Sequence, residues 1–192
     1  MNRQAIILLL LAGALTGCAP SVITAENKPL VDRPPVASED GIDVYFAPDG
    51  GANTAVIREI EHAKQSIDVQ AYLITSKRIV DALDAANARG VKVRIVLDKS
   101  NIGGTYSFNA FFSSSKIPVW RDAKHKGVHD KVMLVDGRTI VTGSYNFTDQ
   151  SELNVENMLI IRDKPKLFEA YRQHFEEHLR HSDPPTNVEG NK

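Results

Sequence analysis

Two short segments separated by an Asp-Gly pair constrain the fold of this 192-residue chain more than any other feature. Residues 132–135 and 138–141 are rich in apolar and β-branched side chains, and Asp136 and Gly137 lie between them. An Asp-Gly pair in this setting is typical of a two-residue type I′ turn. The sequence therefore predicts a β-hairpin.

Polar residues at the open end of this hairpin form a compact motif. His129 and Lys131 come at the start of the first strand, and Ser144 and Asn146 follow the second. A two-residue turn sets a register in which Lys131 faces Thr142 and His129 faces Ser144, with Cβ atoms about 5 Å apart. Side chains alternate along a strand, so His129, Lys131 and Ser144 share one face, which Asn146 joins if the strand continues. A nucleophile candidate, a cation, a hydroxyl and a carboxamide together predict a phosphate pocket.

These residues resemble the HxKxxxxD…GSxN signature of the phospholipase D superfamily, whose members break phosphodiester bonds through a histidine nucleophile. The signature corresponds here to HDKVMLVD at residues 129–136 and GSYN at residues 143–146. Similarity to small bacterial nucleases of this superfamily spans residues 42–180 and includes SIDVQAYLIT and GVKVRIVLD. The resemblance implies a phospholipase D-like fold with one motif per chain.

The resemblance also implies a role for each polar residue. His129 attacks phosphorus and forms a covalent phosphohistidine. Lys131 and Asn146 hold the non-bridging oxygens, and Ser144 adds a hydrogen bond. Glu156 stands where the resembling nucleases carry a glutamate that hydrogen-bonds the nucleophilic histidine and fixes its tautomer. The alternative for Glu156 is an ordinary polar residue at the entrance of a strand.

Asp136 belongs to the signature but has a second interpretation. Its odd offset from His129 points it to the opposite face of the strand, and aspartate before glycine favours a turn. Both interpretations stay open. The expected catalytic residues are His129, Lys131, Asp136 and Glu156, and the expected phosphate-binding residues are Lys131, Ser144 and Asn146.

The single copy of the motif predicts a partner. One imidazole cannot be both the deprotonated nucleophile and the acid that protonates the leaving oxygen. Superfamily members with one motif form symmetric dimers, so the acid is expected to be His129 of a second subunit in a composite homodimer site. The scheme requires no metal and no cofactor. His174, His178 and His181 recur at helical spacing and could bind zinc or form a polar flank, and the sequence leaves this open.

The N-terminal region predicts export and anchoring. Residues 1–17 have the charge and apolar pattern of a signal peptide, and the Leu-Thr-Gly-Cys sequence that ends at Cys18 resembles a bacterial lipobox. Residues 18–40, with a lipidated Cys18 and several prolines, are expected to form a flexible tether. Residues 41–182 are the expected catalytic domain, and residues 183–192 a polar tail. The expected location is the bacterial cell envelope, anchored by lipid in the outer membrane and facing the periplasm.

Apolar periodicity predicts alternating strands and helices. Expected strands cover residues 42–46, 66–73, 91–97, 117–120 and 155–161 besides the hairpin, and expected helices cover residues 54–63, 79–90, a short segment around 108–112, and 164–180. This pattern predicts an α/β fold with a mixed β-sheet sandwiched by helices.

Charge does not select a substrate, because 23 basic and 24 acidic residues nearly balance. The favoured function is a metal-independent, sequence-nonspecific endonuclease that hydrolyses DNA, and RNA as a further substrate. A phospholipase D or cardiolipin hydrolase that acts on membrane phospholipid is the first alternative, since the attack chemistry is the same. A non-catalytic envelope lipoprotein is the second alternative, and the intact motif argues against it.

Overall fold

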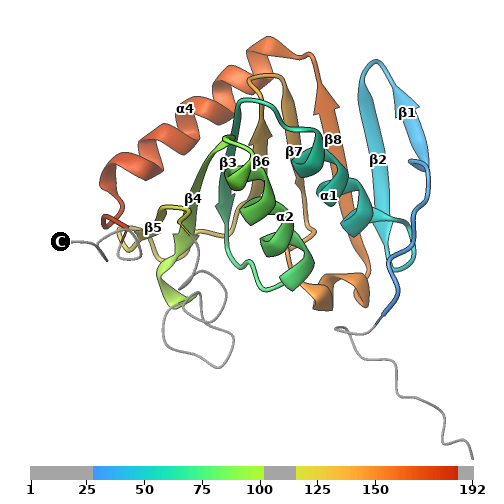
Figure 1. Ribbon diagram of the computed structural model, residues 1–192, viewed down its shortest axis with the longest axis horizontal. Coiled ribbons are helices and arrows are strands. Elements are labelled where there is room, and N and C mark those ends of the chain that lie inside the picture. The colour runs from blue at the N-terminus through green and yellow to red at the C-terminus, as the bar shows by residue number, and fades with distance from the viewer. Residues whose placement is uncertain (1–27, 102–115, 186–192) are drawn as a thin grey trace, which may run out of the picture.

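A mixed β-sheet forms the centre of the structure, a computed structural model that describes residues 28–101 and 116–185. The strands are β1 (Ala37–Glu39), β2 (Ile42–Ala47), β3 (Ser66–Ala71), β4 (Lys92–Asp98), β5 (Val119–Asp122), β6 (Lys131–Val135), β7 (Thr139–Gly143) and β8 (Glu156–Arg162). They lie in the order β1-β2-β8-β7-β6-β3-β4-β5 (Figure 1). β4 runs parallel to both β3 and β5, and the other neighbouring pairs are antiparallel. The predicted mixed sheet is confirmed.

Helices cover both faces of this sheet (Figure 1). They are α1 (Ala52–His62), α2 (Lys77–Ala88) and α4 (Pro165–His181), with short 3-10 turns at Lys99–Asn101 and Asp149–Glu152. Because side chains alternate along β6, Met133 joins the core under α1 and α2, whereas Leu134 packs with Phe168 and Phe175 of α4. The predicted sandwich is therefore confirmed. In the described ranges, no helix has the length and apolar character that crossing a membrane requires.

The predicted elements match the observed ones with ends that differ by a few residues. β1 was not among the predicted strands, because its sequence, Ala-Ser-Glu, carries no apolar alternation. The predicted short helix around residues 108–112 lies outside the described residues. The same is true of the predicted signal peptide over residues 1–17 and of the predicted lipidation of Cys18.

The expected boundary between tether and domain at residue 40 is wrong for the part of the tether that the structure describes. β1 pairs with β2, so it belongs to the sheet. The Lys28 ammonium donates to the Glu152 carbonyl at 2.8 Å, and the Val31 carbonyl accepts from the Thr54 hydroxyl at 3.0 Å. The expected polar tail also begins too early, because Asp183 pairs with β5 through the backbone of Arg121. The folded body therefore extends beyond residues 41–182 at both ends.

The hairpin between β6 and β7 has the predicted turn but a different register. Asp136 and Gly137 have φ values of 51° and 72°, and the Arg138 N–H donates to the Val135 carbonyl at 3.1 Å, as expected of a type I′ turn. Val135 pairs with Thr139, however, so Arg138 is an extra residue, as in a β-bulge. Every predicted pair across the hairpin is therefore shifted by one residue.

Candidate active site

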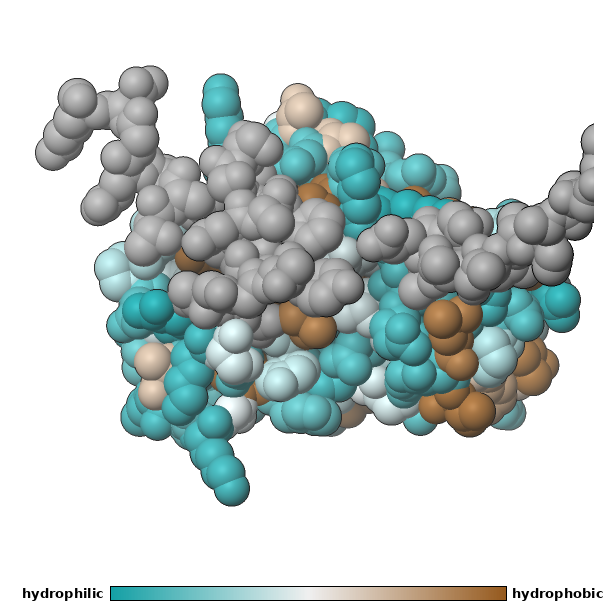
Figure 2. Space-filling view, turned by 90° about the horizontal axis from the view of Figure 1, so that it is seen from below, coloured by the Kyte–Doolittle hydropathy of each residue, from teal (hydrophilic) through white to brown (hydrophobic). Residues whose placement is uncertain are grey.

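The ends of β3 and β4 and the start of β6 meet at one edge of the sheet, the lower edge in Figure 1. Ala71 at the end of β3 pairs with both Leu97 and Lys131. His129 lies two residues before the start of β6 and therefore where the parallel strands end, the edge at which open α/β sheets commonly bind ligands. Figure 2 looks onto this edge, and the described residues that are visible there form a mainly hydrophilic surface with separate hydrophobic groups.

His129 and Lys131 form a close pair at this edge. The Lys131 Nζ lies 3.2 Å from His129 Nδ1 and donates to the His129 carbonyl at 2.6 Å. The Tyr72 ring lies beside both groups, with its centroid 5.1 Å from the centroid of the imidazole and 5.3 Å from Nζ. His129 is exposed, whereas Lys131 is buried. The predicted proximity of a nucleophile candidate and a cation is therefore found.

Burial lowers the pKa of the Lys131 ammonium below its ordinary value, and the carboxylates of Asp130 and Glu156 only partly offset this effect. The cation is buried beside an exposed imidazole. A phosphate oxygen that reaches Lys131 would thus meet a charge that water screens only weakly.

Ser144 and Glu156 form a second pair. Because of the shifted register, the predicted pairing of Ser144 with His129 is wrong, and the Ser144 hydroxyl donates to Glu156 at 2.5 Å instead. The Asn157 N–H donates to the same hydroxyl at 3.1 Å, and Asn154 donates to the other Glu156 oxygen at 3.1 Å. The predicted hydrogen bond from Glu156 to His129 is absent from the described residues. Glu156 acts on the first pair through its charge on Lys131.

Asn146 is held in place by its two neighbours. The Tyr145 hydroxyl donates to Glu152 at 2.6 Å, and the Phe147 carbonyl accepts from the N–H groups of Thr75 and Ser76 at 3.1 Å each. Both rings are buried. The Asn146 Oδ1 atom is buried as well and has no hydrogen-bond partner. Because Oδ1 is an acceptor, it does not bind a phosphate oxygen, and the Nδ2 group of the same carboxamide is the donor that such an oxygen would require.

Gly143 allows β8 to approach this segment. A Cβ atom at this position would lie 2.3 Å from the Asn157 carbonyl oxygen and 2.9 Å from the Met158 Cα, and the φ angle of Gly143 is +152°. The Ser144 N–H then donates to the same Asn157 carbonyl at 3.1 Å. The glycine of the Gly-Ser-x-Asn sequence is therefore required by the close contact between the two strands.

Asp136 does not take part in this site. It lies at the opposite end of β6, where its carboxylate accepts the backbone N–H groups of Lys64, Gln65 and Ser66 at 2.8, 2.7 and 3.0 Å. Burial would raise its pKa, but these three hydrogen bonds outweigh it and hold the pKa below the ordinary value of 3.8. These contacts favour the turn interpretation of Asp136 over a direct catalytic role. The carboxylate fixes the loop between α1 and β3.

We expect Asp136→Asn to lower the free energy of unfolding by about 1–2 kcal/mol at neutral pH, because charge-assisted hydrogen bonds are weakened while asparagine retains the positive φ. A depressed carboxyl pKa stabilises the fold above the ordinary value of 3.8, and this contribution is lost as pH falls through the folded pKa. The difference between the two proteins should therefore shrink as pH falls below this value. Urea unfolding over a pH series measures it.

Turnover per folded molecule should stay unchanged in Asp136→Asn. A variant that keeps its stability but loses turnover would contradict the structural role and restore the catalytic one.

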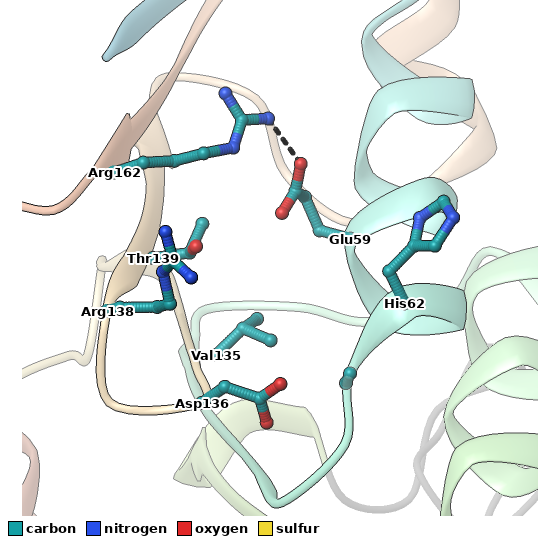
Figure 3. A pocket seen from close by; sticks show the side chains of 8 residues that line it. Glu59, His62, Val135, Asp136, Arg138, Thr139 and Arg162 are labelled. Atoms are coloured by element: carbon teal, nitrogen blue, oxygen red, sulfur yellow. Dashed lines mark hydrogen bonds and ion pairs between the residues drawn. The ribbon is translucent and has the colours of Figure 1, made fainter.

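A pocket of about 220 Å³ also lies at the turn end of the hairpin rather than beside His129 (Figure 3). Its lining includes Asp136, Arg138 and Arg162. Arg138 forms an ion pair with Asp163, and Arg162 forms ion pairs with Asp43 and Glu59. Since both arginines are paired with carboxylates, this pocket offers no free cation for a phosphate.

One group among the described residues could hold a metal ion. Its members are Asp122, His125, His178 and His181, whose ligand atoms lie within 4.8 Å of one another. Burial would raise the pKa of Asp122, but hydrogen bonds from His178 and His181 and from the Lys124 N–H hold it well below its usual range. The helix histidines are therefore more than a solvated polar flank.

Sequence reasoning missed the residues that position the segment before His129. The buried Asp98 carboxylate accepts the Val128 N–H at 2.6 Å, and the Asp130 carbonyl accepts the Tyr72 N–H at 2.9 Å. The Gln70 side chain donates to the Asp130 carboxylate at 2.8 Å. Asp98 and Tyr72 stand at the ends of β4 and β3, and this placement at the edge that carries the motif is the signal that could have identified them.

The sequence and the fold of this chain are similar to those of known proteins of the phospholipase D type. The family model described as "Cardiolipin synthase, PLD-like domain" matches residues 56–179. A phospholipase D of Rickettsia prowazekii (strain Madrid E) is 37% identical over 139 residues, which cover 72% of this chain and 67% of the relative. A mitochondrial cardiolipin hydrolase of Xenopus tropicalis is 30% identical over 123 residues, or 64% of this chain and 58% of that protein.

The fold is also similar to the crystal structure of Nuc, a phospholipase D family member from Salmonella typhimurium. The TM-score is 0.71 at 37% sequence identity, and the match covers 74% of this chain and 96% of that one.

Proposed function

Because the chain belongs to the phospholipase D superfamily and is one of its phosphodiesterases, we propose that it is a metal-independent, sequence-nonspecific endonuclease that hydrolyses DNA, with RNA as a further substrate. The observation that carries the proposal is the close pair of exposed His129 and buried Lys131 at the edge where the parallel strands end. The loop that leads to His129 supports a nucleic-acid substrate. It carries Lys124 and Lys126 on an exposed segment, where they can contact a phosphate backbone.

The first chemical step forms a nitrogen–phosphorus bond at His129 and breaks the bond from phosphorus to the leaving oxygen. Lys131 and the Asn146 carboxamide stabilise the non-bridging oxygens as negative charge grows on them, and Ser144 adds a hydrogen bond. In the unliganded chain, Lys131 Nζ lies beside His129 Nδ1. Attack through Nε2 requires a proton on Nδ1, so Lys131 moves to the phosphate and Glu156 becomes the acceptor for Nδ1.

The second step hydrolyses the phosphohistidine with water. The leaving oxygen takes a proton from His129 of a second subunit, and the same imidazole then removes a proton from the attacking water. Apolar side chains next to Glu156 support a partner at this edge, because Val155 is 90% exposed and Leu153 is 41% exposed. We propose that a second copy covers them and completes the site.

Hydrolysis of a membrane phospholipid is the second candidate. It is supported by the names of the relatives, phospholipase D in Rickettsia prowazekii and cardiolipin hydrolase in Xenopus tropicalis, and it uses the same attack chemistry. Lipidation of Cys18 and a location in the outer membrane, facing the periplasm, remain part of both proposals. Mass spectrometry of the N-terminal peptide from bacterial membranes tests the lipid directly.

A substrate panel tests the proposed function. The purified full chain is incubated briefly with plasmid, single-stranded DNA, RNA and phospholipid vesicles, each with excess EDTA. Nicking of DNA that survives the chelator supports the endonuclease. Turnover of lipid alone would establish the second candidate instead, and no turnover of any substrate would support the non-catalytic lipoprotein.

The composite site predicts how activity responds to mixed subunits. When wild-type chains are mixed with an equal amount of His129→Ala chains and allowed to exchange, only about a quarter of the dimers carry two intact histidines. We therefore expect the mixture to have about a quarter of the activity of a sample that contains only wild-type chains at the same total chain concentration. Independent monomers would retain about half, and that result would exclude the shared site. Light scattering establishes the dimer separately.

A further inference from the structure

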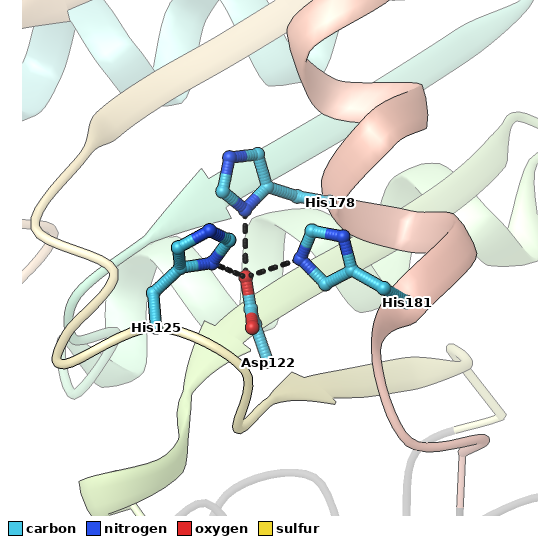
Figure 4. Close-up of side chains that lie close together, drawn as sticks. All are labelled: Asp122, His125, His178 and His181. Carbon is cyan, nitrogen blue, oxygen red and sulfur yellow. Dashed lines mark hydrogen bonds and ion pairs between the residues drawn. The ribbon is translucent and has the colours of Figure 1, made fainter.

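Three imidazoles surround one buried carboxylate oxygen between β5 and α4 (Figure 4). His125 Nδ1, His178 Nδ1 and His181 Nε2 lie 3.3, 2.6 and 3.0 Å from Asp122 Oδ2. The Asp122 side chain is 0% exposed. These four residues are called the Asp-His cluster.

The Asp-His cluster is built from two pairs with short spacing. Asp122 ends β5 and His125 follows in the next loop, while His178 and His181 lie in the last turns of α4. Each pair is separated by two residues, which is a common spacing for two ligands on one metal ion. The packing of α4 against the end of β5 brings the pairs together, and the backbone of Asp183 fixes this contact by pairing with Arg121.

Hydrogen bonding alone accounts poorly for this arrangement. A carboxylate oxygen has two lone pairs, yet three ring nitrogens converge on Oδ2, while Oδ1 accepts the Lys124 N–H at 2.9 Å. The rings of His125, His178 and His181 also lie close together, with centroids 4.9 to 5.0 Å apart. If all three were charged, they would repel one another. A cation between the four ligand atoms would instead use their lone pairs.

We propose that Asp122, His125, His178 and His181 bind a structural zinc ion. Three imidazole nitrogens and one carboxylate oxygen suit zinc, and four protein ligands complete its tetrahedral shell. Zinc–ligand bonds of about 2.0–2.1 Å place ligand atoms roughly 3.3 Å apart. The ligand atoms now lie within 4.8 Å of one another, so the widest pair closes by roughly 1.5 Å through side-chain rotation. No position is left open for water or substrate, so this ion has no part in phosphodiester cleavage.

The zinc ion would fasten α4 to the loop that leads to His129. The His174 ring lies against His178 at 4.4 Å between centroids, and its Nε2 is 3.4 Å from the carboxylate of Asp130, the neighbour of His129. His125 and Val128, on the same loop, are held by Asp122 and Asp98. The zinc ion would thus stabilise the position of His129 through the loop and through Asp130, without touching substrate.

Metal content tests the proposal without any assay of activity. The untagged full chain is loaded with Zn²⁺, desalted and analysed by mass spectrometry of the metal, beside His178→Ala, His181→Ala and the control His62→Ala. His62 is exposed on α1, and its Nδ1 lies 2.8 Å from the Arg58 carbonyl oxygen. We expect one zinc ion per chain in the wild type and in His62→Ala, and at least a tenfold loss in the two cluster variants.

Two further measurements keep the test independent of how well the variants fold. Zn²⁺ at about 100 times its Kd should raise the Tm of the wild type by roughly 5–10 °C and leave His178→Ala unchanged. Co²⁺ bound to the wild type should give the strong visible absorption of a tetrahedral site. A wild type that retains no metal and shows no Tm shift would establish a metal-free cluster and overturn the proposal. Equal zinc in the wild type and both cluster variants would place the ion elsewhere and overturn it too.

Discussion

The His129→Ala variant should lose at least about 10⁴-fold in the rate of phosphodiester cleavage. The substitution removes the nucleophile in one subunit and, in the other subunit of the dimer, the imidazole that protonates the leaving oxygen. His129 is exposed, so its replacement should change the free energy of unfolding by no more than about 0.5 kcal/mol. Rates are measured under saturating substrate, with circular dichroism and thermal unfolding as checks of the fold.

A trapping experiment distinguishes loss of the nucleophile from loss of a supporting group. Wild-type protein quenched during turnover of labelled substrate should carry acid-labile label on the peptide that contains His129, and His129→Ala should carry none. The matched control is His62→Ala, another exposed histidine, which should keep both turnover and label. If His129→Ala still cleaved at the wild-type rate, or if label appeared on another residue, the assignment of the nucleophile would be wrong.

The Gly143→Ala variant should be destabilised by roughly 2–4 kcal/mol, because the new Cβ meets the Asn157 carbonyl at 2.3 Å and because the φ of +152° strains an L-residue. The clash is with backbone, so β8 itself has to shift. Glu156 and Asn157 would move with it and displace Ser144. A displacement of about 1 Å at a catalytic site can cost roughly 100-fold in rate. Urea unfolding and steady-state kinetics measure the two effects.

Gly137→Ala provides the control for backbone strain alone. Gly137 also has a positive φ, +72°, but a Cβ there would meet nothing within 4 Å. Its replacement should cost about 1–2 kcal/mol and leave turnover per folded molecule unchanged. Equal effects of the two substitutions on stability and on rate would show that the close approach of β8 is unimportant.

Local sequence predicted the turn of the hairpin but not its register. Asp136 and Gly137 adopt positive φ because these residue types tolerate it, and such a preference is visible in the sequence. The extra residue is Arg138, whose carbonyl accepts the Asp163 N–H at 3.0 Å and whose guanidinium pairs with Asp163 at 2.7 Å. These contacts come from the far end of β8, so no local pattern could reveal them.

For the candidate site, too, the sequence predicted contacts between residues close in the chain but not contacts between distant segments. His129 and Lys131 are two residues apart in the chain, so their proximity follows from the sequence. The partner of Ser144 does not, because the hydroxyl lies between two strands and its contact with Glu156 depends on how β8 starts. Helical spacing likewise placed His178 and His181 on one side of α4. Their meeting with Asp122 depends on how α4 packs against β5.

The position of β2 has a consequence for how the chain acquires its structure during synthesis. In the described residues, β2 pairs with β1 and with β8, and Ile42 lies opposite Ile161. A nascent chain on the ribosome therefore leaves one edge of β2 without its strand partner until β8 emerges, and contacts between such distant segments form slowly. Ribosome-bound chains that end before residue 156 should remain protease-sensitive at β2, so this domain acquires its stability only near the end of translation.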